Sequence, residues 1–293
     1  MTGDDPIGRR RALLLGSGAL GMMLTLGAQV RPARADASAR WGVDYGAATD
    51  PALARACRLL VLEPHHHRPI APLRGKGSTL LGYVSFGEVE KNRPYVAALD
   101  RAGALRAPNP HWPDARLADL RHAAWRDELI ERAIPAILAL GYDGIFIDTM
   151  DNAEAMERAD PAGAAGMVAA GAALIAAVRA HFPTIRIMLN RGYAVLPDVA
   201  RHVDAVLGEA IASRWNFTER RYEKVSDADW AWQAERLRAA RAINAQLTLA
   251  TLDYWDPADT CTVAALYARE RAAGFLPYVA TLALDRLIAE PRA

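Results

Sequence analysis

The strongest constraint on the fold is a repeated alternation of short apolar segments with longer segments of helical periodicity. Eight short apolar runs occur, and most are followed by stretches in which apolar residues return every three or four positions. Nearly continuous apolar strands are typical of a parallel sheet that helices cover. The eight runs are Trp41–Tyr45, Leu59–Leu62, Thr79–Phe86, Gly144–Ile147, Arg186–Leu189, Ala205–Leu207, Leu247–Leu252 and Phe275–Val279.

The number of these units predicts one α/β domain, a single (β/α)8 TIM barrel. Eight strand–helix units fit within the roughly 250 residues of such a barrel, and an open doubly wound sheet is the alternative. We expect irregularity around the second and fifth units, because 63–78 is rich in Pro, His and Gly and 194–203 is barely long enough for a helix. The clearest helical patterns are Arg126–Leu140, Ala164–Ala180, Asp229–Ala245 and Thr262–Ala273.

The first 35 residues differ from the rest and predict an export signal. Arg9, Arg10 and Arg11 precede an apolar, glycine-broken run at 12–30, and a small-x-small cleavage pattern follows at 33–35, which indicates the twin-arginine type. An anchor that stays in the membrane is the alternative. We expect residues 1–35 to be the signal and 36–293 to be the barrel, without a stable membrane span. The protein is then periplasmic or extracellular.

The net charge of +1 is divided unevenly between these two parts. Residues 1–35 carry five arginines and two aspartates, so they contribute +3 and residues 36–293 sum to −2. A domain without a basic stripe is poorly suited to bind nucleic acid through its phosphates. The sequence therefore excludes a nucleic-acid partner.

Common cofactor and nucleophile motifs are missing. No Gly-x-Gly-x-x-Gly follows a strand and no Gly-x-Ser-x-Gly occurs, so we expect no cofactor and no α/β-hydrolase elbow. The His65–His67 run has no partner at a recognised ligand spacing, which disfavours a metal site. Cys57 precedes a strand whereas Cys261 follows one, which predicts two unpaired thiols, with a single disulfide as the alternative.

Polar and acidic residues follow the predicted strands. In a parallel barrel the chemistry lies on the loops after the strands, so these side chains are expected to meet on one face. They are Asp44 and Tyr45, then Ser85, Glu88 and Glu90, then Asp148, Asp151 and Asn152, then Asn190 and Arg191, then Glu209, and finally Asp253, Tyr254, Trp255 and Asp256.

Asp148 and Glu209 are the sharpest candidates for catalysis. Each ends a buried apolar run, and two carboxylates suit glycoside hydrolysis, which needs one to protonate the leaving oxygen and one to act as nucleophile or to activate water. A helix-capping role for Asp148 or Asp151, and a salt bridge between Glu209 and Arg214, are the structural alternatives. The separation of the two carboxyl groups would distinguish a retaining from an inverting reaction.

Five sequence blocks carry a resemblance to a known family. In order and spacing they resemble glycoside hydrolase family 114, the TIM-barrel endo-α-1,4-polygalactosaminidases, and are similar also to the hydrolase domain of the Pel polysaccharide deacetylase-hydrolase. The resemblance spans nearly all of the chain after the signal. The blocks are GYVSFGEVE at 82–90, GYDGIFIDTMD at 141–151, LNRG at 189–192, GE at 208–209 and GFLPY at 274–278.

The resemblance implies hydrolysis of α-1,4-linked galactosamine or N-acetylgalactosamine polymers, such as biofilm exopolysaccharides. It makes Asp148 the nucleophile and Glu209 the acid/base. The family's Asp-Tyr after the seventh strand is kept here as Asp253-Tyr254 and is followed by Trp255, whereas Lys91-Asn92 after the third-strand block departs from the family pattern. The residues expected to bind the polysaccharide are Asp44, Tyr45, Tyr83, Glu88, Asp151, Asn190, Asp253, Tyr254 and Trp255.

Two other functions stay open from the residues alone. One is a non-catalytic carbohydrate-binding or exopolysaccharide-matrix protein on a degenerate barrel, which requires carboxylates that are far apart or occupied by salt bridges. The other is a metal-dependent hydrolase that uses His65–His67. Trp112, in a proline-flanked loop, is suited either to stack on a sugar or to pack under its loop.

Overall fold

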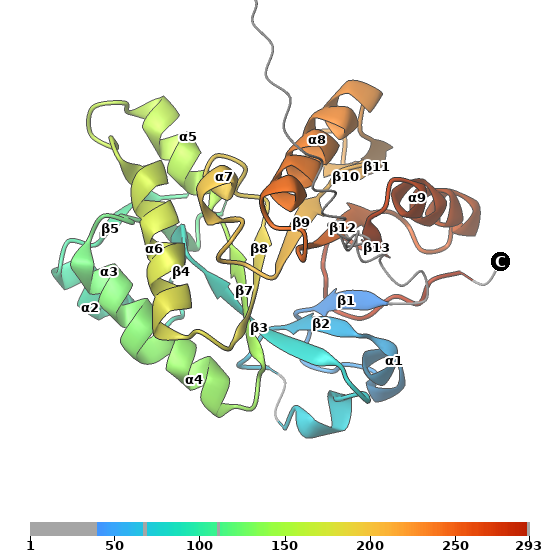
Figure 1. The fold of residues 1–293 in the computed structure, drawn as a ribbon, viewed down its shortest axis with the longest axis horizontal. Helices are drawn as coiled ribbons and strands as arrows, with labels where there is room; N and C mark the ends of the chain where they lie inside the picture. The colour runs from blue at the N-terminus through green and yellow to red at the C-terminus, as the bar shows by residue number, and fades with distance from the viewer. Residues whose placement is uncertain (1–39, 67–68, 110–111, 292–293) are drawn as a thin grey trace, which may run out of the picture. The chain divides into compact units, whose positions relative to one another are not determined.

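The computed structural model describes residues 40–66, 69–109 and 112–291, and its centre is a parallel sheet of eight strands (Figure 1). Hydrogen bonds join the strands in the order β1-β2-β3-β7-β8-β9-β12-β13, so each predicted strand is confirmed and the sheet curls into a nearly closed TIM barrel. Predicted signal residues 1–35 lie outside the described residues. The barrel strands are β1 (Trp41–Asp44), β2 (Leu59–Leu62), β3 (Thr79–Ser85), β7 (Gly144–Asp148), β8 (Arg186–Asn190), β9 (Ala205–Glu209), β12 (Thr248–Tyr254) and β13 (Leu276–Ala280).

The barrel closes between its last and first strands through side chains and a C-terminal segment. Within the described ranges no hydrogen-bonded ladder joins β13 to β1. Instead, the rings of Trp41 and Tyr278 meet edge to face with centroids 5.6 Å apart. The amide of Tyr45 also donates to the carbonyl of Leu284, 2.6 Å away. The seam is therefore held by packing and by the chain that follows β13.

Helices cover the outside of the sheet, as the periodicity predicts (Figure 1). Three of them begin at polar caps: the side chains of Asp50, Ser226 and Asp259 accept backbone N–H groups of the first turns of α1, α8 and α9. No helix among the described residues is long and apolar enough to cross a bilayer. The helices are α1 (Pro51–Ala56), α2 (Val96–Arg101), α3 (Ala123–Glu128), the π-helix η2 (Leu129–Ala133), α4 (Ile134–Ala139), α5 (Asp151–Ala159), α6 (Met167–His181), α7 (Leu196–Val199), α8 (Asp227–Ile243) and α9 (Thr260–Ala272).

The predicted irregularities are confirmed, and two inserts were not predicted. Among the described residues between β2 and β3, the one helical element is the 3₁₀ turn η1 (Ala71–Leu73), and the four-residue α7 follows β8. The two cysteines are unpaired, Cys57 buried and Cys261 exposed. The inserts are an antiparallel sheet after β3, made of β4 (Glu88–Glu90), β5 (Leu105–Pro108) and β6 (Ala115–Ala118), and a hairpin after β9, made of β10 (Ser213–Asn216) and β11 (Arg221–Lys224).

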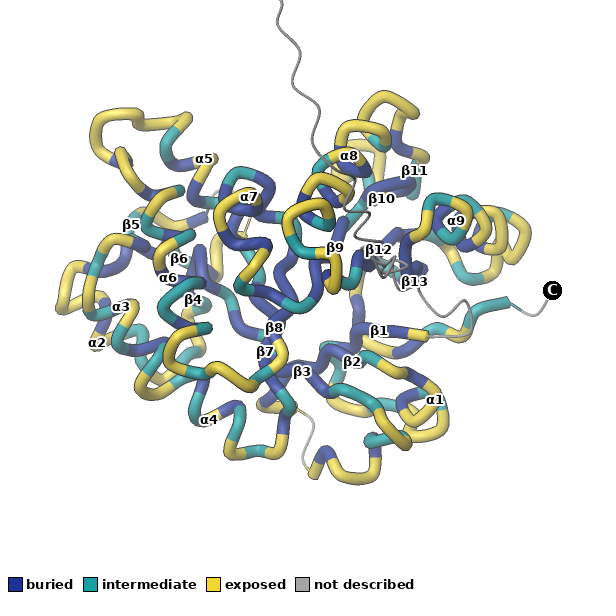
Figure 2. Tube along the Cα trace, in the orientation of Figure 1, coloured by how far each residue is buried: buried dark blue, intermediate teal, exposed yellow. Residues whose placement is uncertain are grey.

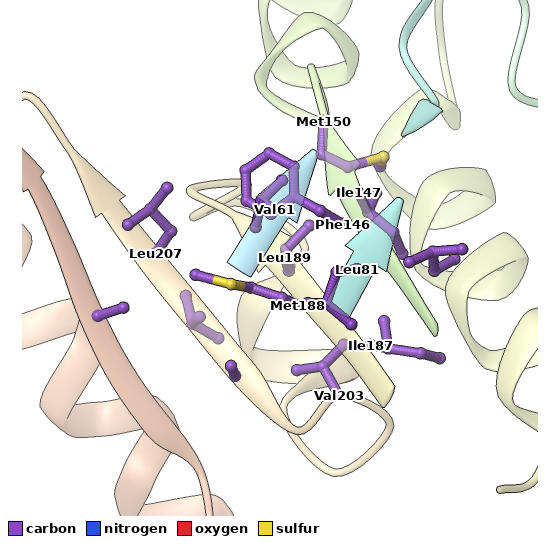
Figure 3. Close-up of a cluster of buried hydrophobic side chains, with 14 of the residues drawn as sticks. Val61, Leu81, Phe146, Ile147, Met150, Ile187, Met188, Leu189, Val203 and Leu207 are labelled. Carbon is purple, nitrogen blue, oxygen red and sulfur yellow. The ribbon is translucent and has the colours of Figure 1, made fainter. Parts of the chain in front are cut away.

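An apolar layer fills the middle of the barrel. The strands are buried while the helices expose their outer faces (Figure 2). Leu81, Phe146, Met188 and Leu207, from four neighbouring strands, lie in one cluster and are at most 2% exposed (Figure 3). Because side chains two positions apart on a strand point the same way, the residue two places further along each strand lies above this layer. Those residues are Tyr83, Asp148, Asn190 and Glu209.

A substitution at Gly144 tests the close contact between β7 and β8. A Cβ at this position would stand 1.8 Å from the carbonyl oxygen of Arg186, which is backbone and cannot turn away. We expect Gly144→Ala to lower the free energy of unfolding by about 3 kcal/mol or more, measured by chemical denaturation. Gly103, whose φ is 75° and whose Cβ would meet nothing within 4 Å, is the control, and Gly103→Ala should cost only about 1–2 kcal/mol. Equal losses would contradict the packing described for Gly144.

Candidate active site

Three neighbouring strands bring the two predicted catalytic carboxylates together. Asp148 ends β7, Asn190 ends β8 and Glu209 ends β9, and the sheet order places β8 between the other two. The side-chain nitrogen of Asn190 donates to Asp148 Oδ1 at 2.8 Å and to Glu209 Oε2 at 2.6 Å, so these two oxygens are at most 5.4 Å apart, the sum of the two distances. One amide therefore fixes the spacing of the pair.

Asp148 is held by further donors and by a strained neighbour. The amide of Thr149 donates to Asp148 Oδ1 at 2.7 Å, and the hydroxyl of Tyr83 also forms a hydrogen bond with this carboxylate. Thr149 has a φ of 64°, in the left-handed region that few non-glycine residues adopt. Its hydroxyl bonds Ser85 Oγ at 2.6 Å and accepts the amide of Gly87 at 2.9 Å, which fixes this conformation. The strain thus aims a backbone amide at the carboxylate.

The capping role considered for Asp148 and Asp151 is not observed. Helix α5 begins at Asp151 and has no side-chain capping bond. Asp151 instead accepts the amide of Gly192 at 3.0 Å and forms an ion pair with Arg191 at 3.1 Å. Asp148 is therefore free of a helix-capping role, and Asp151 ties the loop after β8 to the start of α5.

Glu209 has hydroxyl and amide partners and no cationic partner among the described residues. The hydroxyl of Tyr254 donates to Glu209 Oε1, and Asn190 donates to the other oxygen. Arg214 pairs with Glu223 at 2.8 Å, so the alternative of a salt bridge from Arg214 to Glu209 is not observed. Within the part of the chain that the structure describes, no arginine or lysine forms an ion pair with Asp148 or Glu209.

Burial and mutual repulsion change the acidity of this cluster. Burial, and then the charge of Glu209, raise the pKa of Asp148 to about 6, although the hydrogen bonds from Asn190 and Thr149 oppose the rise. Burial and the neighbouring carboxylates likewise hold the pKa values of Tyr45, Tyr83 and Tyr254 well above the ordinary value of 10. The three phenols are neutral hydrogen-bond donors at physiological pH.

A cavity of about 580 Å³ lies on the β2–β3 side of the site, and Tyr83, which bonds Asp148, is part of its lining. Tyr45 and Tyr83 line it, their rings edge to face with centroids 5.0 Å apart. Glu63 and Glu90 form its acidic wall, and Arg93 forms ion pairs with them at 3.1 Å and 2.9 Å respectively. Glu90 was predicted from its place after a strand, whereas Glu63 was missed. Glu63 directly follows β2, so the same pattern of polar residues after each strand could have identified it.

Two residues expected to bind sugar are instead buried and bonded to neighbouring loops, which corrects that prediction. Asp44 and Asp253 are fully buried. Asp44 accepts Gly46 N and Thr49 Oγ1, both at 2.8 Å, and Asp253 accepts the amides of Ala212 and Ser213, both at 2.7 Å. Because side chains alternate along a strand, Tyr254 reaches Glu209 while its neighbour Asp253 points to the opposite face of the sheet.

The other predicted binding residues lie around the rim. Glu88 is buried and accepts the side-chain amides of Asn109 at 2.5 Å and Asn152 at 3.1 Å. Trp255 is half-buried and donates from its ring nitrogen to Asp259 at 3.0 Å. Both stand beside the carboxylate pair in the fold.

The histidine loop has no metal-binding arrangement among the residues that the structure describes. His66 Nδ1 lies 2.9 Å from the carbonyl oxygen of Tyr45, and His67 lies outside those residues. The described part of the chain has no group of three or more His, Cys, Asp or Glu side chains placed to hold a metal ion.

Comparison with known proteins places the chain among glycoside hydrolases. The profile of glycoside-hydrolase family GH114 matches residues 25–292. The glycoside hydrolase domain of PelA from Pseudomonas aeruginosa is 31% identical with a TM-score of 0.73, over 86% of this chain and 98% of that one. Ega3 from Aspergillus fumigatus, solved in complex with galactosamine, shares the fold at 15% identity and a TM-score of 0.63, over 88% of this chain and 97% of that one. An uncharacterised protein of Deinococcus radiodurans is 28% identical over 230 residues, which are 75% of this chain and 70% of that protein.

The raised pKa of Asp148 predicts a pH-dependent cost to stability. Its folded-state pKa of about 6 lies above the ordinary aspartate value of 3.8, so the folded protein binds the proton more tightly than the unfolded chain. The cost is absent below about pH 4, develops between about pH 4 and 6, and is complete above pH 6. Asp148→Asn removes it, so the free energy of unfolding should exceed the wild-type value by about 1–3 kcal/mol at pH 8 and approach it at pH 4.

Denaturation at the two pH values, with the exposed Asp198→Asn as the matched control, checks this. Asp198→Asn should change the free energy of unfolding by the same small amount at pH 4 and at pH 8. If Asp148→Asn gave an equal gain at pH 4 and pH 8, repulsion within the carboxylate pair would not be its cause.

Proposed function

The chain belongs to glycoside-hydrolase family GH114 and is a glycosidase, and from this premise we propose that it cleaves α-1,4-linked galactosamine or N-acetylgalactosamine polysaccharide. The proposal rests above all on the carboxylate pair that Asn190 bridges. Asp148 Oδ1 and Glu209 Oε2 are within 5.4 Å of each other, given the two hydrogen bonds of 2.8 and 2.6 Å. Retaining glycosidases separate their carboxyl groups by about 5–5.5 Å, whereas inverting enzymes need about 6.5–9.5 Å to admit a water. The spacing supports a retaining reaction.

In this mechanism Asp148 attacks the anomeric carbon and Glu209 protonates the leaving oxygen. Asp148 receives donors from Asn190, Thr149 and Tyr83, whereas Glu209 receives them from Asn190 and Tyr254. The three donors favour the negative charge on Asp148 and oppose the rise in its pKa that burial and the charge of Glu209 cause. Attack gives a covalent glycosyl-enzyme, and Glu209, now ionised, removes a proton from the water that hydrolyses it.

An amino-sugar substrate is supported by charge as well as by kinship. Ega3, of the same fold, was solved with galactosamine. The cavity beside the pair carries Glu63 and Glu90 against the single Arg93, which suits a cationic sugar. We propose further that residues 1–35 direct export, so that the substrate is a polysaccharide outside the cytoplasm, and that no nucleic acid is a partner.

The non-catalytic alternative has no support from the geometry. It requires carboxylates that are far apart or neutralised by salt bridges. Asp148 and Glu209 are close, and neither has a cationic partner within the described ranges.

Reducing-end release from α-1,4-galactosaminan, with and without N-acetylation, tests the activity. Asp148→Asn and Glu209→Gln should each lower turnover about 10³-fold or more, because each removes a group that the chemistry requires. Asp198→Asn, at an exposed carboxylate outside the site, is the control and should leave turnover nearly unchanged. No release by the wild type, or full activity in both variants, would reject the proposal.

Chemical rescue separates the two roles. With an activated substrate and azide, Asp148→Ala should form the β-glycosyl azide, because azide replaces the nucleophile and inverts the anomeric centre. Glu209→Ala should form the α-glycosyl azide, because azide attacks the glycosyl-enzyme and configuration is retained overall. Proton NMR identifies the anomer, and the reverse result would exchange the two roles.

The loss of activity at low pH should follow the protonation of Asp148. Its pKa is raised to about 6 by burial and by the charge of Glu209. As the pH falls below about 6, Asp148 takes up a proton and can no longer attack, so kcat/KM should fall about tenfold per pH unit. Initial rates between pH 4 and 8 measure this, and constant rates down to pH 4 would exclude Asp148 as the titrating nucleophile.

A further inference from the structure

Two exposed aromatic side chains touch each other at the rim of the barrel. Trp112 is 56% exposed and Phe217 is 66% exposed, yet their rings meet at nearly right angles with centroids 6.3 Å apart. Trp112 lies in the β5–β6 turn of one insert, and Phe217 follows β10 in the other. Large apolar side chains gathered on a surface are typical of a binding site.

Both inserts are rooted beside the carboxylate pair. The β5–β6 turn is fixed by Asn109, whose amide donates to Glu88 at 2.5 Å. The hairpin begins at Ser213, shortly after Glu209. Because β7 and β8 lie between β3 and β9 in the sheet, the contact of Trp112 with Phe217 joins the two sides of the rim across the strands that carry Asp148 and Asn190.

Further rings lie on the same hairpin and beside it. Trp215 precedes Phe217 by two residues. Trp215 packs on Tyr222 of the paired strand with ring centroids 4.8 Å apart, and the ring centroid of Tyr222 lies 6.2 Å from that of Trp255. Trp255 follows the end of β12, the neighbour in the sheet of β9, which ends in Glu209. The aromatic row, defined as Trp112, Phe217, Trp215, Tyr222 and Trp255, thus includes rings of the loop after β12, of the hairpin and of the other insert.

We propose that the aromatic row is a second binding site, which holds uncharged sugar residues of the polysaccharide beyond the point of cleavage. The inference rests on the proposed function. Flat aromatic faces suit the C–H faces of pyranose rings and contribute large apolar contact areas. Several of them on the loops at the same end of the barrel as the carboxylate pair fit an extended polymer and not a single sugar.

Charge selects the kind of sugar. The hairpin carries four exposed basic residues against two acidic ones, and Arg214 already pairs with Glu223. A net positive hairpin disfavours the ammonium group of galactosamine and accepts the neutral N-acetylated sugar. The acidic cavity on the β2–β3 side, in contrast, favours the cationic galactosamine. The basic residues of the hairpin are Arg214, Arg220, Arg221 and Lys224, and the acidic ones are Glu219 and Glu223.

Affinity for polymer tests the row. Asp148→Asn removes the proposed nucleophile and permits binding without cleavage. In this background, Trp112→Ala with Phe217→Ala should weaken binding to long N-acetylated α-1,4-galactosaminan about tenfold or more by affinity electrophoresis. The loss for a trisaccharide should be smaller, because a short ligand placed at the carboxylate pair does not reach the rim. Trp232→Ala, at another exposed tryptophan outside the row, is the matched control and should bind as its parent does.

The outcomes are separable from those of the proposed function. Unchanged polymer affinity in the double variant, with an unchanged melting temperature, overturns the aromatic row even if the wild type cleaves the polymer. An equal loss for trisaccharide and polymer overturns it as well. Failure of the wild type to cleave either polymer rejects the proposed function instead.

Discussion

The amide of Asn190, which donates to both Asp148 and Glu209, is the interaction on which the site depends. Two carboxylates about 5 Å apart repel each other by about 3 kcal/mol in a protein environment with an effective dielectric constant of about 20. Burial strengthens that repulsion, and it appears in the raised pKa of Asp148. A neutral donor placed between them reduces the repulsion without supplying a counter-charge, so the pair stays close and chemically available.

The bridge exists only because the strands beneath it are packed in register. Phe146, Met188 and Leu207 fill the barrel two residues before Asp148, Asn190 and Glu209. Their side chains and those of the three polar residues point the same way, since the strand period is two. The apolar layer thus supports the polar layer, and a slip of one residue in β8 would turn Asn190 away from both carboxylates.

The strands and the meeting of Asp148 with Glu209 could be predicted because both follow from local patterns. Apolar runs ended by Asp148, Asn190 and Glu209 place those side chains at the mouth of any parallel barrel. The failures have one physical source, which is the direction of single side chains. Asp253 and Tyr254 are neighbours at the end of the same strand, so only one of the two side chains can face the site. The sequence does not show which one does. The inserts escaped prediction because short antiparallel strands with one exposed face lack a continuous apolar run.

The seam between β13 and β1 affects the order in which the barrel can be completed. Among the described residues β1 forms a ladder with β2 alone, and its other edge meets Tyr278 and the segment around Leu284. These partners belong to the last barrel strand and the segment after it, so they are synthesised after the other barrel strands. The first strand therefore has an unsatisfied edge throughout synthesis, and the contacts that finish the barrel have the longest separation along the chain. Completion of the fold is thus a late event that involves both ends of the domain.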